Sequence, residues 1–90
     1  LSFGYEIFYW KTASNLEIDF ILYGERGIRA FEVKRSQRVR SEDFKALLAF
    51  LKDYPMAKAY MIYGGERRYW EGPIEVLPAE EALKHFGEIL

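Results

Sequence analysis

Three charged residues stand inside stretches of the sequence that are otherwise apolar. Asp19 lies within EIDFILY, and Glu32 and Lys34 lie within AFEVK. Two carboxylates a few ångströms apart supply half of an oxygen-rich octahedral site for Mg²⁺ or Mn²⁺, which waters and a phosphate complete. An ammonium group beside that ion stabilises the negative charge that develops on an attacked phosphate. These residue types are therefore candidates for metal-dependent cleavage of phosphodiesters, if the fold brings them together.

A β-hairpin is the element expected to bring them together. Residues 16–23 and 28–34 have the β-branched and aromatic composition of strands. The sequence GERG between them begins and ends with glycine, and these glycines supply the positive φ of tight hairpin turns. A symmetric turn around Glu25 and Arg26 then fixes which residues face each other across the two strands.

In the register that this turn sets, Asp19 faces Glu32 and Glu17 faces Lys34, with all four side chains on one side of the sheet. The other side is expected to hold a mostly apolar layer made of Ile18, Phe20, Leu22, Arg29, Phe31 and Val33. Opposed like charges are destabilising without a compensating cation, which favours a metal ion between Asp19 and Glu32. The alternative interpretation is a solvated sheet face, with Glu17 and Lys34 as an ion pair worth under ~1 kcal/mol.

The rest of the chain predicts the elements that cover and extend this hairpin. Ser41 is expected to cap a helix that carries Glu42 and Asp43 in its first turn and ends before Pro55. Further strands are expected at residues 5–10, 58–63, 67–70 and 74–77, with a terminal helix after Pro78. The order β-β-β-α-β-(β)-β-α predicts one α/β domain over residues 1–90. Its sheet is mixed, and the strands before and after the first helix are parallel neighbours.

The spacing D-x(12)-E-x-K of Asp19, Glu32 and Lys34 resembles the PD-(D/E)xK nuclease superfamily. A longer match is more specific, since YWKTASNLEIDFIL followed by FEVKRSQRV, an amphipathic helix and AYMIYGGE looks like a domain of unknown function. That domain forms the C-terminal part of many bacterial and archaeal AAA-type ATPases. The resemblance covers most of the chain, from about Tyr9 to Leu77.

The resemblance implies a restriction-endonuclease-like core, with a crossover helix and a C-terminal helix around the mixed sheet. It implies Asp19, Glu32 and Lys34 as the catalytic residues, with Glu17 as a further acid at the metal. The motif's proline is replaced by Ile18, and the first core helix, which would precede Tyr5, is missing. The chain is therefore expected to be a fragment of a longer ATPase.

A basic run follows the lysine of the motif. Arg35, Arg38 and Arg40 in KRSQRVR are candidates for contacts with nucleic-acid phosphates, and a solvated loop is the alternative. The net charge of −1 does not by itself indicate a polyanionic partner. The expected partners are nucleic acid, with DNA favoured, and the rest of the ATPase chain. The aromatic strand at residues 5–10 also favours a homodimer of the fragment.

Other features exclude classes of protein rather than indicate a function. The absence of cysteine excludes disulfides and thiolate sites and fits a cytoplasmic protein. No apolar run approaches the roughly 20 residues of a membrane span, and His85, the one histidine, is expected to be a surface residue. The sequence thus predicts a Mg²⁺- or Mn²⁺-dependent nuclease domain. The alternative is a non-catalytic module of the same fold for recognising nucleic acid or protein, or for oligomerisation.

Overall fold

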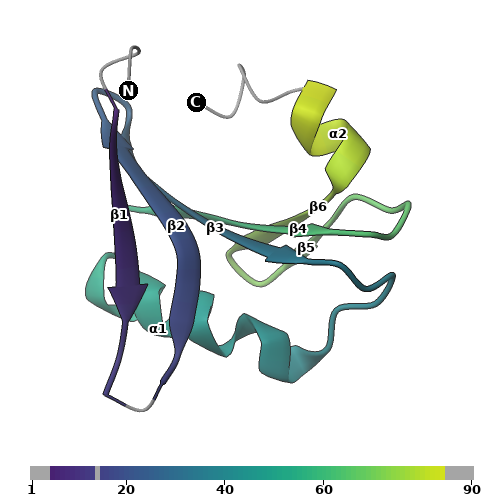
Figure 1. Ribbon diagram of the computed structural model, residues 1–90, viewed down its shortest axis with the longest axis horizontal. Coiled ribbons are helices and arrows are strands. Elements are labelled where there is room, and N and C mark those ends of the chain that lie inside the picture. Colours follow the sequence, from purple (N-terminus) through teal and green to yellow (C-terminus); the bar gives the residue numbers. More distant parts are fainter. Residues whose placement is uncertain (1–4, 14, 85–90) are drawn as a thin grey trace.

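The computed structural model describes residues 5–13 and 15–84, in which a single mixed sheet carries helices on both faces (Figure 1). The strands are β1 (Glu6–Lys11), β2 (Glu17–Gly24), β3 (Gly27–Lys34), β4 (Lys58–Tyr63), β5 (Tyr69–Glu71) and β6 (Ile74–Pro78). The helices are the 3₁₀ turn η1 (Ser41–Phe44), α1 (Lys45–Asp53) and α2 (Ala79–Lys84). The strand order in the sheet is β1-β2-β3-β4-β6-β5. The predicted α/β class and mixed sheet are thus confirmed.

The β2–β3 hairpin has the register that the sequence predicts. Tyr23 pairs with Ile28 and Gly24 pairs with Gly27, in an antiparallel ladder. Of the two turn glycines only Gly27 has a positive φ, of 101°, so the expectation for Gly24 is wrong. Gly24 is needed for a different reason, because a Cβ at this position would collide with the ring of Tyr5.

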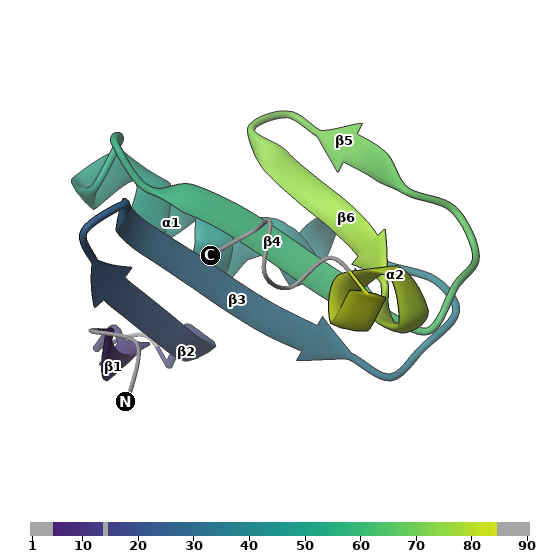
Figure 2. The ribbon, with the colours of Figure 1, turned by 90° about the horizontal axis from the view of Figure 1, so that it is seen from above.

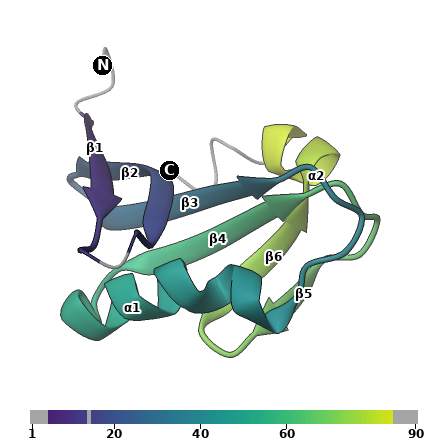
Figure 3. The ribbon, with the colours of Figure 1, turned by 60° about the horizontal axis from the view of Figure 1, so that its bottom comes forward.

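The crossover through α1 also follows the prediction. β3 and β4 are parallel neighbours, and β4 is in turn parallel to β6, while the short β5 pairs antiparallel with the outer edge of β6. Figure 3 shows α1 lying across one face of these strands. The parallel strands β3, β4 and β6 therefore all end at the same edge of the sheet, which Figure 2 shows beside α2.

The start of the first helix differs from the prediction. Arg40, rather than Ser41, is the N-cap residue, and a 3₁₀ turn precedes α1. The carboxylate of Asp43 accepts a hydrogen bond from the Arg40 backbone N–H at 2.8 Å, which satisfies a backbone donor that the helix leaves free. The capping group is thus the carboxylate of Asp43, which lies inside the 3₁₀ turn and binds the N–H of the preceding Arg40. Ser41 is not the N-cap residue.

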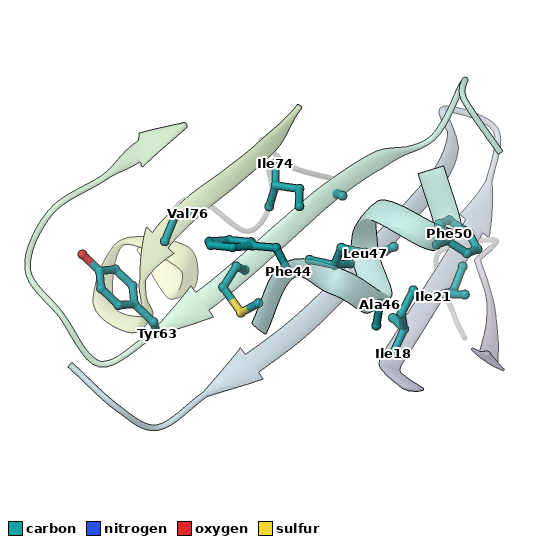
Figure 4. Close-up of a cluster of buried hydrophobic side chains, with 12 residues drawn as sticks. Ile18, Ile21, Phe44, Ala46, Leu47, Phe50, Tyr63, Ile74 and Val76 are labelled. Carbon is teal, nitrogen blue, oxygen red and sulfur yellow. The ribbon is translucent and has the colours of Figure 1, made fainter. Parts of the chain in front are cut away.

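Two hydrophobic cores lie on opposite faces of the sheet. On the α1 side, Leu47 packs against sheet residues that include Met61, Ile74 and Val76, all fully buried (Figure 4). On the other side, Phe31 is fully buried with a cluster that includes Ala82 of α2. Burial of each such large side chain contributes about 1.5–3 kcal/mol to the free energy of folding. Together the two cores fix β3 and β4 at the centre of the domain.

The side of the sheet that was expected for Ile18 is wrong, because β2 contains a bulge. Phe8 of β1 pairs with Ile21, but Trp10 pairs with Ile18, so β2 has one more residue than β1 over this stretch. Ile18 and Ile21 consequently both pack in the α1-side core, whereas Phe20 packs in the other one. The bulge therefore breaks the strict alternation that was expected of β2, next to Asp19.

β1 forms one edge of the sheet and exposes large apolar side chains. Tyr9 is 82% exposed, and Ile7 and Phe8 are about half exposed, while Trp10 packs edge-on against Phe50 of α1. The homodimer expected through this strand stays a prediction. No helix in residues 5–13 and 15–84 combines the length and apolar character that crossing a membrane requires. His85 lies outside the described residues.

Candidate functional site

The second half of β3 directs two charged side chains toward the α1 side of the sheet. Ala30 is fully buried in the α1-side core, and alternation along the strand places Glu32 and Lys34 on the same side. In β4, Met61 pairs with Glu32 and Tyr63 pairs with Lys34. Both neighbours are buried, so Glu32 and Lys34 lie at the rim of the core and are partly shielded from water.

Asp19 reaches this rim from the bulged end of β2. The ladder between β2 and β3 runs from the turn as far as Phe20 and Phe31. Beyond it, the Asp19 side chain replaces a backbone partner, since its Oδ2 accepts a hydrogen bond of 2.7 Å from the Val33 N–H. That bond holds the Asp19 carboxylate against β3, next to Glu32.

A fourth residue, Asp43 of η1, completes the cluster. Its Oδ1 lies 3.0 Å from the Lys34 Nζ, while its Oδ2 accepts the Arg40 N–H. These two contacts, the backbone hydrogen bond first, hold the pKa of Asp43 below its usual range. We refer to Asp19, Glu32, Lys34 and Asp43 as the acidic cluster. The sequence marked Asp43 only as a helix-start acid, because its contact with Lys34, nine residues earlier, depends on the path of the chain from β3 into η1.

Glu32 is the most perturbed acid of the cluster. Its pKa rises from 4.5 to about 7, first because burial disfavours the charged form and then because Asp19 and Asp43 repel a further negative charge. Lys34 opposes this rise without cancelling it. The cluster therefore has an excess of negative charge that a cation would neutralise.

Glu17 does not join the cluster. Its carboxylate lies 3.3 Å from the Nζ of Lys11 on β1, and both side chains are well exposed. Lys34 pairs with Asp43 instead, so the predicted cross-strand pair of Glu17 and Lys34 does not form within the described chain. The bulge explains the difference, because it changes the direction of β2 between Ile21 and Ile18.

The family of the chain follows from a comparison with known protein families. A family model described as a domain of unknown function, DUF4143, matches residues 2–82. The chain belongs to the DUF4143 family. No curated protein and no solved structure matches the chain. The match includes all four residues of the acidic cluster, which is therefore part of the DUF4143 domain itself. The resemblance to a domain of unknown function is confirmed, while the ATPase association and the nuclease superfamily stay predictions.

The DUF4143 domain offers few ligands for a metal ion. In the part of the chain that the structure describes, no group of three or more Asp, Glu or His side chains is close enough to hold one. The fit therefore depends on two carboxylates, Asp19 and Glu32, with water and a phosphate oxygen as the remaining ligands. Mg²⁺ is commonly bound in this way, through one or two carboxylates and substrate phosphates.

The predicted basic residues lie in the loop between β3 and η1. Arg35, Arg38 and Arg40 are all exposed. Arg38 and Arg40 line a cleft at the ends of the parallel strands. In open α/β sheets ligands bind outside the carboxyl ends of such strands. Two arginines of the predicted three thus lie where this general rule places a binding site.

Proposed function

We propose that this DUF4143 domain binds Mg²⁺ or Mn²⁺ through Asp19 and Glu32 and hydrolyses phosphodiester bonds of nucleic acid, with Lys34 beside the attacked phosphate. One observation supports this most. Two carboxylates from adjacent strands converge on one side of the sheet with a lysine, and burial, followed by repulsion from Asp19 and Asp43, raises the pKa of Glu32 to about 7. A purely structural ion pair balances its positive and negative charges, whereas the acidic cluster holds three carboxyl groups and one ammonium group.

Asp19 and Lys34 each keep polar atoms free for this role. Asp19 uses Oδ2 for the Val33 N–H, which leaves Oδ1 for a metal ion. The Lys34 ammonium has three N–H donors and gives one to Asp43, so two remain for phosphate oxygens. Glu32 would lose its proton when a cation arrives. A bound divalent ion would lower the pKa of a water and neutralise the phosphate.

The wider context of the proposal comes from the sequence resemblance. An antiparallel hairpin, a crossover helix and a parallel strand follow one another in the order expected of a restriction-endonuclease-like core. We infer that the domain works within a AAA-type ATPase chain and that DNA is the favoured substrate. The fold alone does not determine an activity, so a test of this proposal has to alter the residues of the site itself.

The decisive variant is Asp19→Asn. Asparagine keeps an oxygen for the Val33 N–H but removes the charge, so the fold should survive while the metal site is lost. Loss of a group that only orients a metal ligand already costs about tenfold or more in metal affinity. Because Asp19 is proposed as a direct ligand, we expect the Mn²⁺ affinity, measured by calorimetry, to fall by at least that factor and cleavage of labelled DNA to stop. The control is Asp53→Asn at the exposed end of α1. Cleavage by Asp19→Asn at the wild-type rate would contradict the proposal.

A non-catalytic module for recognising nucleic acid is the second candidate. Lys34 is engaged by Asp43 at 3.0 Å, and the described residues offer no three-ligand metal site, which would suit a binding surface without catalysis. This candidate predicts that the wild-type chain shows no saturable Mn²⁺ binding. It also predicts that Glu32→Ala leaves the affinity for an oligonucleotide unchanged.

A further inference from the structure

A second site lies beside the acidic cluster, at the edge where the parallel strands end. It is a cleft of about 730 Å³, lined by residues 36–40 from the β3–η1 loop and by Tyr63, Arg67 and Tyr69. Volumes of 300–1,000 Å³ are typical of ligand pockets. Figures 2 and 3 show that the two loops which form it run side by side, although they are far apart in the sequence.

One backbone hydrogen bond joins the two loops, and further contacts hold the β4–β5 loop in place. The Gly64 N–H donates a hydrogen bond of 2.9 Å to the Ser36 carbonyl oxygen. The buried Tyr63 hydroxyl donates to the Arg67 carbonyl oxygen at 2.6 Å and accepts from the Arg67 N–H at 3.1 Å. Gly65 packs directly on the Tyr63 ring, where a Cβ would not fit. Arg67 is therefore attached to a well-supported loop segment.

The charged residues that line the cleft are all arginines, although the chain as a whole carries a net charge of −1. Arg38, Arg40 and Arg67 contribute three guanidinium groups to its lining, and no carboxylate lines it. Among residues 5–13 and 15–84, Arg38 and Arg67 form no ion pair, and Arg40 is 3.9 Å from Glu42, with both side chains largely exposed. Such unpaired guanidinium groups suit phosphate, which they bind through two parallel hydrogen bonds.

An aromatic ring adds a second kind of contact. Tyr69 lines the cleft and is held edge-on against Tyr63, with the ring centroids 6.1 Å apart. Burial raises the pKa of Tyr69, so its ring stays a neutral phenol at any physiological pH. A ring that is fixed in this way can stack on a nucleobase. Only an unpaired base could reach it, because the bases of a duplex are stacked inside the helix.

We propose that this cleft binds a single-stranded segment of nucleic acid, with Arg38 and Arg67 on a phosphate and Tyr69 stacked on the adjoining base. Arg40 adds positive charge at the side facing Asp43. The inference deepens the proposed function, because the cleft would hold the strand next to the acidic cluster. Arg67 was not among the binding residues that the sequence predicted, since it follows the motif by more than thirty positions.

The test measures binding of a fluorescent oligothymidylate by anisotropy in EDTA, where no cleavage occurs. We expect Arg67→Ala to weaken binding several-fold and to reduce the slope of log affinity against log salt by about 0.7, the value for one phosphate contact on a single strand. The matched control is Arg26→Ala in the hairpin turn, at the other end of β3. It removes the same charge and should leave the salt slope unchanged.

A second pair of variants tests the stacking contact. Tyr69→Leu should weaken binding about tenfold, whereas Tyr69→Phe keeps the ring and should bind like the wild type. Thermal unfolding of each variant shows whether the fold is retained, and Arg67→Ala provides the test if Tyr69→Leu does not fold. A wild-type slope in Arg67→Ala would overturn the proposal. So would equal affinity for duplex DNA, or full displacement of the oligonucleotide by inorganic phosphate or polyglutamate.

The outcome is separable from that of the nuclease proposal. Because the assay contains EDTA, loss of the metal site in Asp19→Asn should not weaken oligonucleotide binding. A domain that fails to bind Mn²⁺ but shows the Arg67 and Tyr69 effects would have the cleft without catalysis. A domain that binds Mn²⁺ and cleaves DNA without those effects would refute the cleft alone.

Discussion

The charge state of Glu32 links the stability of the domain to the chemistry proposed for it. Burial, and then Asp19 and Asp43, raise its pKa to about 7, so the folded chain binds a proton more tightly than the unfolded chain does. A carboxylate that is held in such surroundings destabilises the fold when it is ionised. Functional sites often keep groups of this kind, because a ligand supplies the missing charge.

We therefore expect the stability of the domain to fall as the pH rises from about 4.5 to about 7. The pKa of Glu32 is raised, so over the range from about 4.5 to about 7 the folded state holds more protons than the unfolded state. The free energy of unfolding then decreases as the pH rises through this range, by ~3 kcal/mol at most. Urea unfolding at several pH values measures it.

The control for this prediction is Glu32→Gln, which cannot ionise. It should be more stable than the wild type at pH 8, and the difference should shrink toward pH 5, where Glu32 itself is protonated. Equal pH profiles for the two proteins would show that Glu32 is not the group responsible. Saturating Mn²⁺ should stabilise the wild type at pH 8 and stabilise Glu32→Gln less, because the ion binds the charged carboxylate.

At the scale of elements, Asp43 joins the start of the helix to the end of β3. Its two oxygens bind the Arg40 N–H and the Lys34 ammonium, and its side chain is 16% exposed. We expect Asp43→Ala to lower the free energy of unfolding by about 1–2 kcal/mol, as loss of a helix cap does. Glu42→Ala, which removes the neighbouring exposed acid, should change it by less than ~0.5 kcal/mol. Urea titrations of both variants at pH 7 make the comparison.

The Asp43→Asn variant separates the contribution of the helix cap from that of the ion pair with Lys34. The amide oxygen can still accept the Arg40 N–H, while the Lys34 ammonium loses its anionic partner. The variant should therefore recover most of the stability that Asp43→Ala loses. If both variants were equally destabilised, the ion pair with Lys34 rather than the cap would be the important contact.

Much of this arrangement could be predicted from elements with strong local signals. The turn GERG set the β2–β3 register, and the strand β4 (Lys58–Tyr63) has the bounds that its composition indicated. The bulge could not be predicted, because it arises in the pairing of β2 with β1 and not from the sequence of β2 alone. Because of the bulge, Ile18 packs on the α1 side of the sheet, and Glu17 forms an ion pair with Lys11 instead of Lys34. The nearby Asp19 and Glu32 still meet because Val33 holds Asp19 in place.

Contacts between residues that lie far apart in the sequence could not be predicted either. Arg67 and Tyr69 reach the cleft only because β4 and β6 extend the sheet in parallel beside β3, so that their loops share one edge. Asp43 reaches Lys34 because the connection from β3 into η1 brings the start of the helix back to the end of β3. Contacts of this kind depend on the tertiary fold, and no local pattern in a single sequence encodes them.

At the scale of the whole molecule, the central strands couple the two cores. β3 and β4 contribute side chains to both faces, for instance Met61 on the α1 side and Phe31 on the other. Loss of either core would expose strands that the other core needs. The two cores should therefore unfold together, and a cavity on either side should weaken the entire domain.

Leu47→Ala and Leu77→Ala test this coupling on opposite faces of the sheet. Leu47 is fully buried on the α1 side and Leu77 is 3% exposed on the α2 side, so each change should cost about 2–5 kcal/mol. Leu48→Ala is the matched control, since the adjacent Leu48 is 45% exposed and its loss should cost less than ~0.5 kcal/mol.

In urea, both core variants should shift the midpoint of a single transition and leave its slope unchanged. Far-UV circular dichroism reports the sheet and helices, and the fluorescence of Trp10, measured with the exposed Trp70 replaced by phenylalanine, reports its contact with Phe50 on the α1 side. The two signals should change together in every variant, because a sheet that loses one of its two cores cannot keep β3 and β4 in place. Separate transitions for the two signals in Leu77→Ala would mean that the α2-side core opens alone. The acidic cluster, which lies on the α1 side, would then be independent of α2.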